Sequence, residues 1–129
     1  MFNIKQLNAI DNIIKKNLIS SGIAHVIFMD MGGNAIAKHD NGSTNFDTTA
    51  FAALAAGNFA AVDAMAKLVG ESEFSLLFHR GEKSSIHFSK VNDDMLLIST
   101  FNKDISLGLV RLKVAATIKE LNEILDASM

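Results

Sequence analysis

The chain has 129 residues, a length that suits one domain with its own hydrophobic core. A formal charge of −2 and a pI near 6.0 give no basic footprint, which argues against nucleic acid as a partner. The sequence contains no cysteine, so disulfides and thiolate metal ligands are excluded. The first residues lack the basic and apolar regions of a signal peptide, and we expect a cytoplasmic protein.

The first third of the chain predicts a helix followed by two strands. Apolar residues at helical spacing from Ile4 to Leu18 alternate with lysines, which indicates an amphipathic helix. The segment from Ile23 to Met29 is apolar on both faces and predicts a central strand. A tight reversal from Asp30 to Asn34 contains residues that tolerate positive φ. Ala35 to His39 then predicts a shorter strand nearer an edge.

The segment from Thr48 to Val69 predicts a long helix that has no polar face. Asp63 and Lys67 are its only charged residues, and nine of its residues are alanine. A surface helix of a monomer normally has one apolar stripe and one polar face. Two stripes here contain bulky side chains and suit a sheet, whereas a third contains only small ones: Ala53, Ala56, Ala60 and Ala64.

The small stripe has three possible explanations. A second helix could approach it closely, and we favour a helix from another copy of the chain because so short a domain offers few others. The stripe could instead pack inside the monomer. A membrane span is less favoured, since alanine is only weakly apolar and Asn58, Asp63 and Lys67 interrupt the segment.

The remainder predicts three strands and a final helix. The strands are Glu73–His79, Ser84–Val91 and Met95–Phe101, joined by two polar hairpin connections. The final helix has an apolar face formed by Val110, Val114, Ile118, Leu121 and Leu125. We therefore predict a single α+β domain over residues 1–129. Its five-stranded antiparallel sheet is covered by helices on both faces, in the order helix–strand–strand–helix–strand–strand–strand–helix.

Motifs for catalysis or cofactor binding are absent from the sequence. No phosphate-binding P-loop occurs, and Gly32-Gly33 leads into a strand where a dinucleotide fingerprint would open a helix. The four histidines lack the close spacing of metal ligands, and Asp93-Asp94 suits a solvated hairpin. We expect no enzyme activity, no metal and no cofactor.

Three segments resemble the roadblock/dynein light-chain family, most closely its bacterial MglB-type members, over about Ile4 to Leu125. They are the reversal at Asp30-Met31-Gly32-Gly33, the alanine-rich helix, and the segment from Ser106 to Arg111. The last segment is similar to the family's Leu-Gly-x-Val-Arg signature at the entry to the final helix. The residues that carry the signature are Gly33, Leu107, Gly108, Val110 and Arg111.

The resemblance implies a homodimer, or a heterodimer with a roadblock-family paralogue, that binds a Ras-like small GTPase. In such a dimer the long middle helices pack together and the third strands can pair. The predicted dimer interface comprises Ala52, Ala53, Ala56, Phe59, Ala60, Asp63, Phe74, Leu76 and Phe78. The alternative is a dynein-light-chain-like scaffold that dimerises and holds another protein without acting on a GTPase. A small-molecule sensor is less favoured, because the sequence suggests no roomy polar pocket.

The arginine content constrains how such a regulator would act. GTPase activation often uses an arginine in trans, and this chain has only Arg80 and Arg111. Arg111 starts a predicted helix, where a structural use is expected, and Arg80 lies at a hairpin tip. We therefore expect any stimulation of hydrolysis to come from repositioned groups of the GTPase itself.

Overall fold

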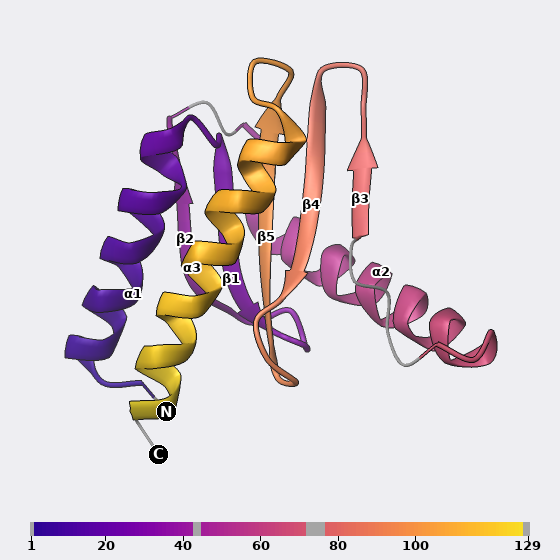
Figure 1. Cartoon of the computed structure of the whole chain (residues 1–129), viewed down its shortest axis with the longest axis horizontal. Helices are drawn as coiled ribbons and strands as arrows, with labels where there is room; N and C mark the ends of the chain where they lie inside the picture. The colour runs from indigo at the N-terminus through magenta and orange to yellow at the C-terminus, as the bar shows by residue number, and fades with distance from the viewer. Residues whose placement is uncertain (1, 43–44, 72–76, 128–129) are drawn as a thin grey trace.

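The computed structural model describes residues 2–42, 45–71 and 77–127, and these form one antiparallel sheet with helices on both faces (Figure 1). The strand order is β2-β1-β5-β4-β3. The strands are β1 (His25–Asp30), β2 (Ala35–Asp40), β3 (Leu77–Arg80), β4 (Ser84–Lys90) and β5 (Met95–Asn102), and the α-helices are α1 (Ile4–Asn17), α2 (Thr48–Leu68) and α3 (Leu107–Ala127). This confirms the predicted fold and places the weak second strand at an edge.

Helices α1 and α3 cover one face of the sheet. Asn3 caps α1 reciprocally, since its side chain accepts from the Gln6 N–H at 2.8 Å and the Gln6 side chain accepts from the Asn3 N–H at 2.9 Å. The core on this face joins both helices to β1 and β5: Ile10, Ile14, Leu18, Val26, Phe28, Leu97, Phe101, Val110, Val114 and Leu121. The predicted apolar side of the final helix therefore faces the sheet.

Helix α2 covers the opposite face. Asp47 begins it, because its carboxylate accepts from the N–H groups of Thr49 and Ala50 at 3.0 and 3.1 Å. The buried residues of a second core cluster are alanines from the helix and larger side chains from the strands: Ala52, Ala55, Ala56, Ile27, Met29, Phe88, Leu96 and Ile98. Small residues on the helix allow α2 to lie close to the sheet.

The β1–β2 reversal also contacts α2. Asp30 shapes the turn, since its Oδ1 accepts from the N–H groups of Gly32 and Asn34, each at 2.9 Å. Gly33 has φ +87°, and a Cβ placed there would lie 3.2 Å from the Cα of Ala53 and 3.3 Å from the carbonyl oxygen of Ala52. Glycine is required on both counts, because side chains disfavour this φ and the helix backbone occupies the space.

Candidate protein-interaction surface

The side of α2 that faces away from the sheet is exposed and apolar. Leu54 is 75% exposed, Met65 54% and Leu68 86%. Five small exposed residues lie beside them on the same side of the helix: Ala53, Gly57, Ala60, Ala61 and Ala64. We call these eight residues the α2 face. Contiguous apolar surface of this kind marks interaction sites in folded proteins.

Length and composition alone would also allow α2 to cross a membrane. Among the described helices it is the one that passes this test, with a mean hydropathy of 1.3. The test is weak evidence, because core helices of soluble proteins pass it as well. The buried alanines of α2 pack on the sheet of the same chain. One side of the helix therefore belongs to the core, and the other side is available for contact with a partner.

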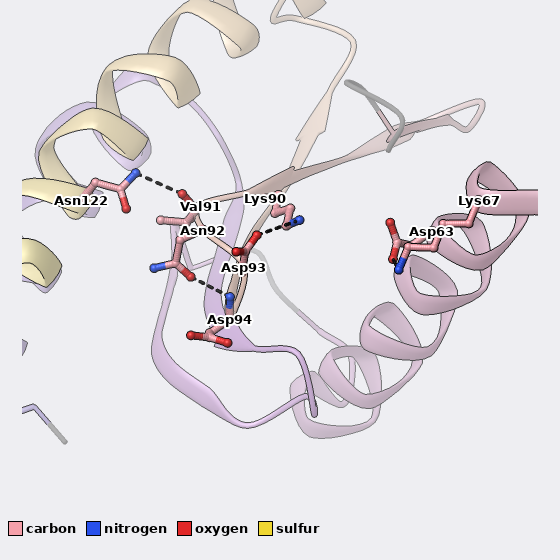
Figure 2. Close-up of polar contacts among 8 residues, drawn as sticks. All are labelled: Asp63, Lys67, Lys90, Val91, Asn92, Asp93, Asp94 and Asn122. Carbon is pink, nitrogen blue, oxygen red and sulfur yellow. Dashed lines mark hydrogen bonds and ion pairs between the residues drawn. The ribbon is translucent and has the colours of Figure 1, made fainter. Parts of the chain in front are cut away.

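Charged groups lie beside the α2 face near its C-terminal half. Asp63 pairs with Lys67 on the helix at 3.2 Å, and Lys90 pairs with Asp93 at the β4–β5 turn at 3.3 Å. Figure 2 shows the two pairs on their separate elements, with the Asp63 carboxylate pointing toward the turn. A cleft of about 200 Å³ separates them and includes Ala60 in its lining. The apolar face therefore has a charged border on this side.

The open edge of the sheet lies on the other side of α2. In the described part of the chain, β3 pairs with β4 and no strand lies beyond it. A hydrogen bond of 3.1 Å between Asn58 Nδ2 and His79 Nε2 joins α2 to β3. This contact supplies the partner that a polar amide in an apolar helix requires. Leu54 of the α2 face lines a shared hollow with Asn58 and His79, so the α2 face and β3 are neighbouring surfaces.

The predicted interface residues are distributed over three environments. Ala53 and Ala60 are exposed on the α2 face, whereas Phe59 and Asp63 are half-buried. Ala52 and Ala56 are only 2% and 7% exposed because they pack against the sheet of their own chain.

The remaining predicted positions lie around β3. Phe78 is a residue of β3 opposite His87, while Phe74 and Leu76 lie outside the described residues. Contact of all these residues with a partner chain stays a prediction. The residues of α2 that the fold leaves exposed include Leu54, Gly57, Ala61 and Ala64, whereas Ala52 and Ala56 are buried.

The signature at the start of α3 has a structural role in part. Val110 is fully buried in the core, and Leu107 packs against it, whereas Gly108 is exposed. Arg111 is exposed and lies close enough to the buried His87 to act on its charge. Burial and, secondarily, the Arg111 guanidinium lower the pKa of His87 to about 4. The Nδ1 of this neutral ring lies 3.2 Å from the Ser89 hydroxyl.

A packed histidine near the start of α2 was not foreseen from the sequence. His25 is 2% exposed, and among the described residues neither ring nitrogen has a hydrogen-bond partner. Its ring makes edge contacts with Phe46 and Phe51 at centroid distances of 5.2 and 5.7 Å. Burial lowers its pKa. No sequence signal pointed here, because Phe46 belongs to a polar loop.

The histidines occupy opposite faces of the sheet. His25 lies on the α2 side, whereas the side chain of His87 lies on the α3 side, beside Arg111. Among the residues that the structure describes, no three histidine, aspartate or glutamate side chains come together as potential metal ligands.

Comparison with known proteins identifies the family. Residues 10–100 match the model of the Roadblock/LC7 domain, and the chain belongs to this family. The fold and the family define a regulatory, binding class of protein. Within the family the chain is MglB-like: it is similar to the structure of Myxococcus xanthus MglB, with 32% identity over 100% of this chain and 96% of that chain and a TM-score of 0.90.

More distant structures share the fold. The gliding protein MglB of Thermus thermophilus is 24% identical over 98% of this chain and 95% of that chain, with a TM-score of 0.86. A Roadblock/LC7 domain from Streptomyces avermitilis is 12% identical over 89% of this chain and 96% of that chain, with a TM-score of 0.78. A search of curated protein sequences finds no match.

Proposed function

We propose that this protein is a cytoplasmic, non-catalytic dimer that binds and regulates a small Ras-like GTPase, as an MglB-type regulator. The observation that carries the proposal is the α2 face, which is apolar and exposed although the other side of the same helix is packed on the sheet. Membership of the Roadblock/LC7 family and the likeness to Myxococcus xanthus MglB support it.

The α2 face and the β3 edge suit association with a second copy. The small side chains of Gly57, Ala60 and Ala64 permit a close approach of two helices. Complete burial of a fully exposed side chain of this size contributes roughly 1.5–3 kcal/mol before the entropic cost of association. Leu54 and Leu68, at 75% and 86% exposed, would gain most of this value, and Met65, at 54%, about half. The unpaired side of β3 can accept a strand from a second sheet.

Any stimulation of GTP hydrolysis would rely on groups that the GTPase already has. Arg111 belongs to α3, which covers the sheet face opposite α2, and it acts on the buried His87. Arg80 is exposed and is the last residue of β3, opposite Ser85. The proposed mechanism is therefore binding that repositions catalytic groups of the GTPase, with no arginine donated by this chain.

The test compares Ala60→Glu with Ala115→Glu. Ala60 lies on the α2 face, whereas Ala115 is an equally small exposed residue on α3 and serves as the matched control. We expect Ala60→Glu to reduce the molar mass measured by light scattering and to weaken GTPase binding, because a carboxylate would be buried without a partner. Wild-type mass and unchanged GTPase binding in Ala60→Glu would refute the proposal.

The identity of the partner is tested by affinity capture from the protein's own cells. Wild-type protein should retain a GTP-binding chain that Ala60→Glu does not retain. Capture of a protein that does not bind GTP, by the wild-type chain and not by Ala60→Glu, would favour the scaffold role over GTPase regulation.

A further inference from the structure

An open groove runs between α1 and α3 on the side of these helices that faces away from the sheet. Its volume is about 810 Å³. The floor is apolar, with Ala9 and Ile13 contributed by α1 and Ile124 and Ala127 by α3. The groove lies on the opposite side of the sheet from α2, so a partner on the α2 face leaves it accessible (Figure 1).

The two walls of the groove carry opposite charge. Lys5 and Lys16 line it from α1, whereas Glu120 and Glu123 line it from α3. Within the described chain, no ion pair joins these lysines to these glutamates. Glu120 accepts a hydrogen bond of 2.8 Å from the Asn17 amide, and Glu123 is exposed. A basic wall and an acidic wall therefore flank an apolar floor.

The Asn17–Glu120 hydrogen bond shows which residues of α1 and α3 lie at the same level along the two helix axes. The helices run antiparallel (Figure 1), and each residue rises about 1.5 Å along its axis. Lys16 therefore lies near the level of Glu120, and Ile13 lies near the level of Glu123 and Ile124. Lys16 and the two glutamates therefore occupy a shared stretch of the helix pair, whereas Lys5 lies about 18 Å along α1 from the level of Glu120.

We propose that this groove binds a second copy of the chain through a two-fold axis parallel to the helices. Rotation about that axis leaves each residue at the same level along the helices. It places α1 of each copy over α3 of the other. Lys16 of one copy then meets the acidic wall formed by Glu120 and Glu123 in the other. Each helix has only antiparallel neighbours, which is the favourable arrangement of helix dipoles in a four-helix bundle.

The charges select this axis over the alternative. A two-fold axis perpendicular to the helices would place α1 on α1, with Lys5 facing Lys16 of the other copy and no carboxylate between them. An interface between identical copies must be self-complementary, and only the parallel axis satisfies this condition. The contact is separate from the one proposed for α2, so the two together would join pairs into larger assemblies.

The experiment uses charge reversal and its rescue. Lys16→Glu and Glu123→Lys should each weaken the association constant of this step by about tenfold, since attraction becomes repulsion at two symmetric positions. The double variant Lys16→Glu/Glu123→Lys should recover it, because the walls are again opposite in charge. Lys15→Glu is the control, with the same charge change at an exposed α1 residue outside the groove.

Association is measured by light scattering at low salt in the wild-type chain and in an Ala60→Glu background, which separates this step from any contact through α2. We expect the Ala60→Glu chain to form dimers that Lys16→Glu dissociates. The inference is overturned if that chain stays monomeric at high concentration, if Lys15→Glu has the same effect as Lys16→Glu, or if the double variant fails to recover.

Discussion

Gly33→Ala tests whether the β1–β2 turn positions α2. The substitution forces an alanine into the left-handed region, at φ +87°, which costs about 1–2 kcal/mol. The new Cβ would also lie 3.2 Å from the Cα of Ala53 and 3.3 Å from the carbonyl oxygen of Ala52. Relief requires the turn and α2 to move apart by a few tenths of an ångström, and overpacking of this kind costs roughly 1–3 kcal/mol. We expect a total loss of about 2–5 kcal/mol.

Gly70→Ala is the matched control for the backbone cost. Gly70 follows α2 at φ +89°, and a Cβ there would meet no atom within 4 Å. Only the conformational cost applies, about 1–2 kcal/mol. The difference between the two variants isolates the contact of the turn with the helix backbone.

Urea denaturation of both variants provides the measurement. Gly33→Ala should have the lower midpoint by a clear margin, with a similar dependence of unfolding free energy on urea concentration. Equal free energies of unfolding for Gly33→Ala and Gly70→Ala would show that α2 yields without cost. That result would refute the argument that the turn fixes the helix against the sheet.

Three further predictions concern single side chains. Because the folded pKa of His87, about 4, lies below its ordinary value of 6.5, stability is greatest above pH 6.5 and falls as the pH drops toward 4. This decrease in the free energy of unfolding, up to ~3 kcal/mol by urea denaturation, should be smaller in His87→Gln. The same pH dependence in His87→Gln as in the wild type would show that His87 does not cause the decrease. Gly57→Ala should raise the free energy of unfolding by ~0.5–1 kcal/mol, and with it the urea midpoint, since the site is helical and nothing lies within 4 Å of the new Cβ; a lower midpoint would show an unseen contact. Arg80→Ala should leave GTPase stimulation largely intact in single-turnover assays, whereas a loss of about a thousandfold would identify a donated arginine.

Hydrophobic periodicity in the sequence was sufficient for the element order and the fold class. The continuous apolar run from Met95 to Ile98 indicates a strand buried on both faces. The spacing of Val110, Val114 and Leu121 specifies which side of the final helix faces the core, because a wrong rotation would expose large apolar side chains. Membership of the Roadblock/LC7 family was likewise recognisable from the sequence, whereas the signature assigned to Leu107, Gly108, Val110 and Arg111 stays a prediction, because it lies outside the residues that match the family model.

The rotation of α2 was beyond the reach of periodicity. Ala52 and Ala56 are buried, and Ala53 and Ala60 are exposed, yet all four side chains are identical and give no preference for either side. The choice depends on what the helix meets in space, including the large strand residues beneath it and the turn at Gly33.

The sequence by itself determined the elements, the antiparallel sheet and the presence of one helix with too much apolar surface for a polar exterior. Only the tertiary structure decided which side of that helix is exposed, that Asn58 bonds to His79, and that opposite charges line the groove between α1 and α3. The physical reason is that side-chain spacing specifies a periodic face along one element. Contacts between elements distant in the chain depend on strand order and packing distance, which no local pattern contains.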